Sequence, residues 1–154
     1  KRTVYTEIDI NASPDAVKKI FLEFDQWFKW CKVFPKIEIL SGDINDIASK
    51  PKLDLTLDFG RKSDPQKAPV NPIITVNSKK VFVWGVYNGI LIKAEHVFVF
   101  EPTNEGKGTR LIHYETMKGM LSPFLMTNKV KANMAEHYNI MNQDLKNFCE
   151  NRNQ

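Results

Sequence analysis

Hydrophobic and polar residues alternate along several stretches of the chain, which is the pattern of half-buried β-strands. Residues 4–10 place Val4, Thr6 and Ile8 on one side, and residues 53–59 show the same alternation in its cleanest form. Because successive side chains of a strand point to opposite faces, each stretch has one dry face and one wet face. The same reasoning predicts further strands at residues 37–40, 73–77, 80–87, 93–101 and 109–117.

Turn residues separate the later strands. Asn77 with Ser78, and Asn88 with Gly89, are typical of hairpins, so we expect the strands around them to be antiparallel neighbours. Residues 60–71 contain two prolines and several charges, which predicts an irregular loop.

Helical spacing replaces the alternation in three places. Ser13 and Pro14 are a cap-plus-proline start for a first helix, and we expect Asp25 to cap a second short one that ends before Pro35. From Ser122 a helix of roughly 28 residues is predicted. It carries an apolar stripe, Met134, Tyr138, Met141, Leu145 and Phe148, opposite the polar Asn133, Glu136, Asn142 and Lys146.

The order of these elements predicts an α+β fold. Strands and helices do not alternate as β-α-β units, which argues against a parallel sheet. We therefore expect one domain over residues 1–154, in which a curved, seven-stranded antiparallel sheet wraps around the long C-terminal helix. Two short helices follow the first strand.

Charge and hydropathy exclude several classes of function. The net charge is +4, from 22 basic and 18 acidic residues, and no basic run is interleaved with aromatic residues, so we expect no nucleic-acid partner. Most of these charges are expected to form a solvated surface, with attraction to an anionic membrane surface as the alternative. The longest apolar stretch, residues 81–87, has the length of a strand, so we expect no integral membrane segment.

The two cysteines, Cys31 and Cys149, are too few for a disulfide framework and lack zinc-site spacing. We expect neither a metal nor a cofactor. A cytoplasmic location is expected, although Lys1 is compatible with a removed leader and Asn11 begins a glycosylation sequon, so secretion stays open.

Several motifs resemble the START-like superfamily (SRPBCC, Bet v 1-like), and its polyketide cyclase/dehydrase-like branch in particular. The resemblance covers essentially the whole chain. It rests on the strand-to-helix entry at residues 7–17, on Asp25 with Trp30, and on Trp84 and residues 95–102, 108–110 and 113–115, followed by Gly119 and Pro123. Cys31 and Lys32 replace the asparagine and proline that often follow that tryptophan.

The resemblance implies a helix-grip fold with a space under the long helix. It also implies that the short helices cradle one end of that helix, which would bring Cys31 and Cys149 near each other; two free thiols or a disulfide are both compatible with this. Such folds host carriers, cyclases, hydrolases and regulatory modules, so function has to be argued from the site.

Strand parity predicts which side chains face the helix. If Phe98 points inward, then so does His96, and Leu111 brings His113 and Glu115 with it. The residues expected to line a ligand cavity are Leu55, Leu57, Phe82, Trp84, His96, Phe98, Phe100, Leu111, His113, Glu115, Met134, Tyr138 and Met141. The same residues would serve equally as a filled core.

His96, His113 and Glu115 are the polar exceptions in this apolar wall. A buried carboxyl group must be paired, protonated or hydrated, and a histidine is a natural partner. The trio is compatible with a structural hydrogen-bonded anchor, with ligand orientation, or with proton transfer in catalysis. His137 is expected on the surface or at the cavity rim.

Three functions remain open. The leading hypothesis is a binding or carrier protein for a lipid, sterol or polyketide-like molecule, with residues 60–71 gating the cavity. The second is a cyclase or dehydratase that uses His96, His113 and Glu115. The third is a protein-interaction module in which outward-facing Val97 and Val99 form a contact, so we expect a monomer or a weak homodimer.

Overall fold

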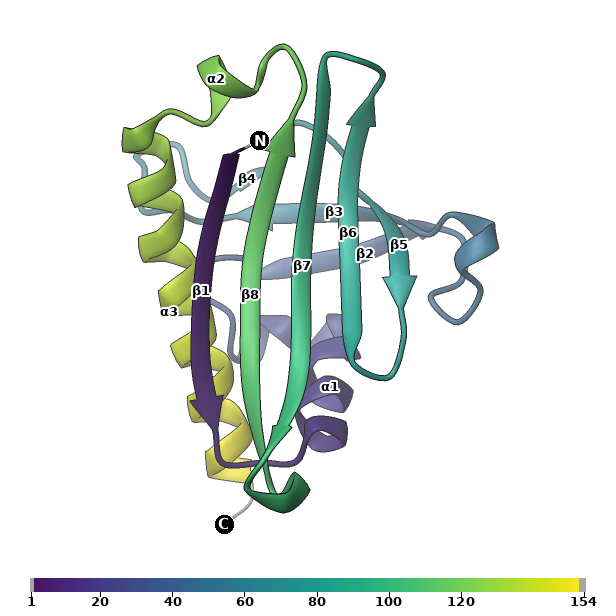
Figure 1. The fold of residues 1–154 in the computed structure, drawn as a ribbon, viewed down its shortest axis with the longest axis vertical. Helices are drawn as coiled ribbons and strands as arrows, with labels where there is room; N and C mark the ends of the chain where they lie inside the picture. Colours follow the sequence, from purple (N-terminus) through teal and green to yellow (C-terminus); the bar gives the residue numbers. More distant parts are fainter. Residues whose placement is uncertain (1, 153–154) are drawn as a thin grey trace.

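The strands predicted from the alternating pattern form one antiparallel sheet in the computed structural model, which describes residues 2–152 (Figure 1). The strands are β1 (Arg2–Ile10), β2 (Lys36–Ser41), β3 (Lys52–Leu57), β4 (Gln66–Lys67), β5 (Ile73–Asn77), β6 (Val81–Asn88), β7 (Ile92–Thr103) and β8 (Gly108–Lys118). Their spatial order is β1-β8-β7-β6-β5-β3-β2, and β4 pairs with β3. The sheet therefore has eight strands, one more than predicted.

The additional strand lies in the segment that we expected to be an irregular loop. Gln66 pairs with Leu57 and Lys67 with Thr56, and the Ala68 amide donates to the Leu55 carbonyl oxygen at 2.8 Å. Two residues are too few for an alternation pattern to be visible, so sequence reasoning missed β4.

The register of β6, β7 and β8 aligns the predicted inner faces. Trp84 lies opposite His96, His96 opposite Glu115, and Phe98 opposite His113. Directly opposed residues point to the same side of an antiparallel sheet. The aromatic and titratable residues of these strands therefore share one concave face.

The first helix begins as predicted. In α1 (Pro14–Leu22) the Ser13 hydroxyl oxygen accepts a hydrogen bond from the Ala16 amide at 3.2 Å. The second short helix is the 3-10 helix η1 (Phe24–Lys29), which follows Glu23 and has no side-chain cap, so the predicted cap at Asp25 was wrong. Two further 3-10 turns are η2 (Ile47–Ser49) and η3 (Asn104–Gly106).

The long C-terminal helix is interrupted near its start. A single turn, α2 (Ser122–Leu125), precedes α3 (Asn128–Arg152), whose 25 residues lie along the sheet beside β1 (Figure 1). The fully buried Met126 lies between them, and the Thr127 hydroxyl accepts from the Val130 amide at 3.3 Å. This threonine is a helix-capping residue, so the prediction of one helix from Ser122 was wrong by one turn.

An aromatic cluster fills the space at the α1 end of the sheet. Phe21 is fully buried, and its ring centre lies 5.1 Å from that of Phe82, 4.7 Å from that of Phe98 and 5.4 Å from that of Phe100. Edge-to-face and tilted packing at these distances is the favourable geometry for aromatic rings. This end of the molecule is therefore a solid core.

Cys31 and Cys149 are both buried and both free. Burial raises the pKa of each thiol to about 12, which keeps both protonated at neutral pH. Among residues 2–152, no helix is long and apolar enough to cross a membrane.

Candidate functional site

A cavity of about 460 Å³ lies between the concave face of the sheet and the first half of α3. Its size falls within the usual range for small-molecule sites, about 300–1,000 Å³. Part of the set predicted to line a cavity does line it: Leu55, Leu57, Trp84, His96, Glu115, Met134 and Tyr138.

The rest of the predicted set lies deeper, outside the cavity wall. These residues are at most 1% exposed and belong to the core: Phe82, Phe98, Phe100, Leu111, His113 and Met141. The three phenylalanines share strand faces with the lining residues but pack around the ring of Phe21, which occupies the space beside them. The sequence pattern was compatible with a filled core or with a cavity, and the structure has both, at different ends of the same sheet face.

Much of the remaining wall comes from the segment between β3 and β5, which sequence reasoning described only as a gate. Phe59, Arg61 and residues 68–70 line the cavity, together with Pro72. The Arg61 guanidinium lies over the Phe59 ring at 5.6 Å, so its charge covers an aromatic surface at the rim. The alternation predicted a strand up to Phe59, but β3 ends at Leu57. Beyond Phe59 no periodic pattern marks this segment, and only its length and position pointed to it.

His137 holds this rim to α3. Its Nδ1 lies 2.8 Å from the Asn133 carbonyl oxygen, and its Nε2 lies 3.2 Å from that of Phe59. The rings of His137 and Phe59 are 4.6 Å apart. His137 thus lies beside Phe59, a residue of the cavity wall.

A buried chain of hydrogen bonds runs from the cavity wall along the concave face of the sheet to α3. His96 Nε2 lies 2.6 Å from His113 Nε2, and His113 Nδ1 lies 2.8 Å from Asn142 Oδ1. Asn142 Nδ2 donates to the Thr6 hydroxyl oxygen at 2.9 Å, and that hydroxyl donates to the His113 carbonyl oxygen at 2.7 Å. Asn142 was expected on the polar side of the helix, but it is 1% exposed, so that placement was wrong.

The directions of these bonds fix the protons on both imidazoles. Because Asn142 Nδ2 donates to Thr6, Asn142 Oδ1 is the acceptor for His113 Nδ1–H. A neutral imidazole has only one ring proton, so His113 Nε2 accepts from His96 Nε2–H. This leaves Nδ1 of His96, a residue of the cavity wall, as a hydrogen-bond acceptor.

Burial keeps the two histidines neutral. It lowers the pKa of His113 to about 4, against the opposing effect of Asn142. Burial and the neighbouring His113 lower the pKa of His96 well below its usual value. An apolar environment destabilises the charged form of an imidazole, so both rings are uncharged at neutral pH.

Glu115 is another polar group of the cavity wall. Burial raises its pKa to about 7, although the Tyr138 hydroxyl donates a hydrogen bond to its carboxyl group and opposes this effect. Burial and the neighbouring Glu115 raise the pKa of Tyr138 well above its usual value. Near neutral pH the carboxyl group is therefore present in both forms, as an acceptor and as a donor.

The polar trio does not converge on one point in the cavity. His96 and Glu115 line it, whereas His113 is fully buried behind His96 and positions that ring. Within residues 2–152, no three His, Cys, Asp or Glu side chains are grouped so that they could hold a metal ion. The arrangement can accept a hydrogen bond at His96 and either accept or donate one at Glu115.

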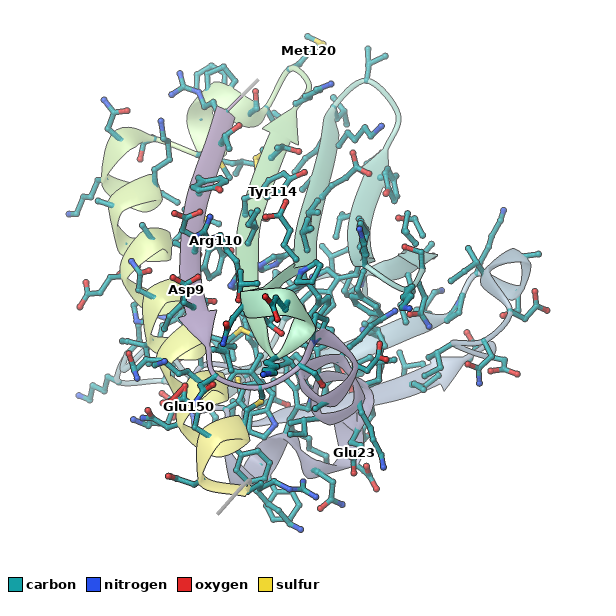
Figure 2. The ribbon with its side chains drawn as sticks, turned by 60° about the horizontal axis from the view of Figure 1, so that its bottom comes forward. Asp9, Glu23, Arg110, Tyr114, Met120 and Glu150 are labelled. Atoms are coloured by element: carbon teal, nitrogen blue, oxygen red, sulfur yellow. The ribbon has the colours of Figure 1, made fainter. Side chains whose placement is uncertain are left out.

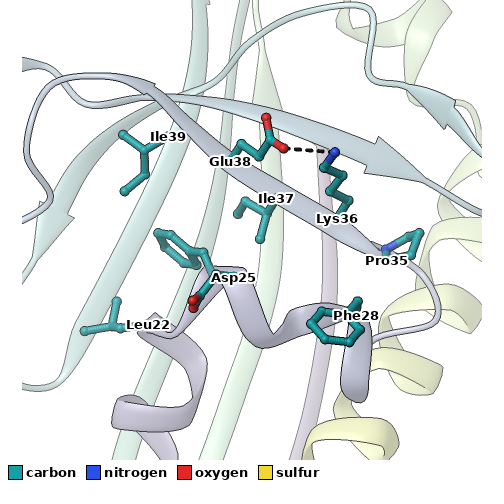
Figure 3. A pocket seen from close by; sticks show the side chains of 9 residues that line it. Leu22, Asp25, Phe28, Pro35, Lys36, Ile37, Glu38 and Ile39 are labelled. Atoms are coloured by element: carbon teal, nitrogen blue, oxygen red, sulfur yellow. Dashed lines mark ion pairs between the residues drawn. The ribbon is translucent and has the colours of Figure 1, made fainter.

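A second hollow of about 770 Å³ lies outside the sheet, between η1 and the edge strand β2 (Figure 3). Leu22, Phe28 and Ile37 are among its apolar walls, and Lys36 and Glu38 pair across 2.9 Å beside them. Although it is larger, this groove contains no buried titratable group. We therefore place the candidate site in the inner cavity.

Comparison with known proteins finds similarity at the level of structure. No family model and no curated sequence matches the chain. A START superfamily protein from Mycobacterium smegmatis superposes with a TM-score of 0.74 at 16% identity, covering 98% of this chain and 99% of that one. The Zhui aromatase/cyclase from Streptomyces sp. R1128 superposes with a TM-score of 0.75 at 12% identity, covering 99% and 96%.

A protein from Thermus thermophilus is also similar, with a TM-score of 0.73 at 15% identity over 99% of this chain and all of the other. These likenesses extend over whole chains and share the sheet wrapped around a C-terminal helix. The protein therefore has the START-like, helix-grip fold expected from its motifs. At these identities the likeness establishes the fold alone.

Proposed function

We propose that this protein binds a hydrophobic small molecule in the cavity between the sheet and α3. The observation that carries the proposal is a mainly apolar space of about 460 Å³ with His96 and Glu115 among its few polar wall residues. Apolar walls favour an apolar ligand, and a few polar groups in the wall orient it.

The polar groups narrow the ligand class. His96 presents an acceptor, and Glu115 with Tyr138 presents an acceptor or a donor, so the ligand should carry a hydroxyl or carbonyl oxygen at one end of an apolar body. Lipids, sterols and polyketide-like molecules have this form. The aromatase/cyclase and START superfamily proteins with the same fold support this class.

Filling the cavity tests the proposal. Met134→Trp places a larger side chain against the ligand space, and we expect it to weaken binding of the aromatic, anionic probe 8-anilinonaphthalene-1-sulfonate at least about tenfold. Ile140→Trp, at a position 36% exposed on the same helix, is the matched control. Native mass spectrometry followed by organic extraction identifies any ligand that co-purifies.

Equal binding of the probe by wild type and by the Met134→Trp variant would contradict the cavity as the binding site. Loss of binding in both tryptophan variants would show damage to α3 and would also count against this interpretation.

A proton-transfer enzyme is the second candidate, because a carboxyl group with a pKa of about 7 is suited to general acid–base catalysis at neutral pH. It predicts that Glu115→Gln abolishes cyclisation or dehydration of a polyketide-like β-ketone but leaves binding of that compound within about threefold. Unchanged turnover would exclude Glu115 as the catalytic group. His113 would act only by positioning His96.

The protein-interaction hypothesis has less support. Val97 and Val99 are half-buried on the outer side of β7. The expectation of a monomer or a weak homodimer stays a prediction.

A further inference from the structure

Large apolar side chains are exposed together at one end of the molecule. They come from the β6–β7 turn and from the connection between β8 and α3, and we call them the apolar tip: Ile90, Leu91, Met120, Leu121, Phe124 and Leu125. Phe124 is 77% exposed, Ile90 76% and Met120 65%. Met120 lies at the extremity of the molecule in Figure 2.

Backbone hydrogen bonds join the two segments of the tip. The Met120 amide donates to the Ile90 carbonyl oxygen at 3.1 Å, and the Leu121 amide donates to that of Leu91 at 3.0 Å. Gly119 supports the contact with a φ of +104°, and a Cβ there would lie 2.5 Å from the Leu91 oxygen. The apolar residues are thus held as one surface rather than on two independent loops.

Packing within the chain does not explain why these residues are apolar. In the same segment Met126 is fully buried, whereas Phe124 and Leu125 point away from the protein. Polar residues would occupy such a turn at no cost to the core, and contiguous exposed apolar surface commonly marks an interaction site.

The charge around the tip has one sign. Residues 88–94 and 116–135 contain no acidic residue but include Lys93, Lys118 and Lys129. All three lysines are exposed. Lys93 pairs with Glu95 at 3.4 Å, whereas neither Lys118 nor Lys129 forms an ion pair with another residue of the described chain. An apolar centre with a basic rim complements an anionic lipid surface.

The tip also adjoins the wall of the cavity. Ile92, Met117 and Val130 line the cavity, and each lies within a few residues of a tip residue along the chain. A surface that covered the tip would therefore lie beside this part of the cavity wall.

We propose that the apolar tip docks onto a membrane surface that contains anionic lipid. Phe124, Met120 and Ile90 enter the boundary between headgroups and acyl chains, and Lys118 and Lys129 remain among the anionic headgroups. Docking brings the cavity mouth to the bilayer, where an apolar molecule is exchanged without crossing water. This goes beyond the proposed function, because docking itself requires no ligand in the cavity.

Flotation with vesicles tests the proposal. We expect the protein to float with vesicles of phosphatidylcholine containing about 30% phosphatidylglycerol, to bind less to phosphatidylcholine alone, and to be released by about 0.5 M NaCl. Phe124→Ser should weaken binding to the mixed vesicles about tenfold, because it removes one inserted aromatic ring. Phe28→Ser changes a residue that is 68% exposed on η1, away from the tip, and should have no effect.

A charge-matched pair of variants tests the basic rim. Lys118→Gln with Lys129→Gln should weaken binding to the mixed vesicles, whereas Lys79→Gln with Lys80→Gln should not, because these exposed lysines lie in the β5–β6 turn at the opposite end (Figure 1).

Absence of flotation by the wild-type protein would overturn the proposal, and so would equal loss of binding in the Phe124→Ser and Phe28→Ser variants. The competing possibility is that the tip forms a contact between two copies of the protein, and sedimentation velocity tests it. A wild-type dimer that Phe124→Ser dissociates, together with no vesicle binding, would assign the tip to that contact and overturn the membrane proposal. The part of anilinonaphthalene-probe binding that Met134→Trp removes reports separately on the cavity, so failure of either proposal can be recognised.

Discussion

Glu115 and the buried histidines make the stability of the protein depend on pH in opposite directions. The pKa of Glu115 rises to about 7 on folding, so its protonated form stabilises the native state fully at low pH and this contribution is lost as pH rises through 7. The pKa of His113 falls to about 4, so the contribution of its neutral form is lost as pH falls from the unfolded value toward 4. The two effects oppose each other in the wild-type protein.

Glu115→Gln removes the Glu115 contribution, so the difference between wild type and variant isolates it. We expect the difference in unfolding free energy between wild type and variant to fall by on the order of 3 kcal/mol between about pH 4.5 and about pH 7. Urea denaturation at a series of pH values measures this difference. A constant difference across that range would show that Glu115 ionises as an ordinary exposed carboxyl group does.

Asn142 links the histidine pair to α3. Asn142→Leu would leave the Nδ1–H of His113 without an acceptor, and a buried unsatisfied donor costs about 1–3 kcal/mol. Asn139→Leu, at an exposed position on the same helix, should change stability by less than about 0.5 kcal/mol. Chemical denaturation of both variants checks the prediction, and equal effects would contradict it.

At the scale of elements, His137 fastens the segment between β3 and β5 to α3. Its two ring nitrogens lie within hydrogen-bond distance of two carbonyl oxygens, that of Asn133 on α3 and that of Phe59 in the cavity wall. A single side chain thus bridges the helix and the wall of the cavity mouth.

His137→Ala should loosen this rim. We expect faster amide hydrogen exchange at residues 59–70, with exchange in β7 and β8 unchanged, because local opening depends on local contacts. Glu136→Ala, at the exposed neighbouring position, is the control. An unchanged exchange rate in the His137→Ala variant would show that β4 alone holds the segment.

At the scale of the whole molecule, stability and the candidate site lie at different ends of one sheet face. Phe21 and the rings around it fill the α1 end, whereas the other end has the cavity, its rim and the apolar tip. Changes in the residues around the cavity therefore leave the core buried. The same division explains why the inward-facing residues of β7 include both core and cavity residues.

The sequence by itself determined the elements and their sides. The alternation of β7 and β8 predicted that His96, His113 and Glu115 share the concave face, and the Ser13 cap predicted the start of α1; both follow from local backbone geometry. The two-residue strand β4 and the break before α3 escaped prediction, because each is too short to produce a period.

Only the tertiary structure decided which inward residues border empty space. Phe98 and His96 have the same parity, yet Phe21 packs against the first and the cavity opens beside the second. Likewise, the pKa of Glu115 and the burial of Asn142 arise from contacts between segments far apart in the chain. Parity is set by neighbours along a strand, whereas volume and desolvation depend on what other elements bring to the same place.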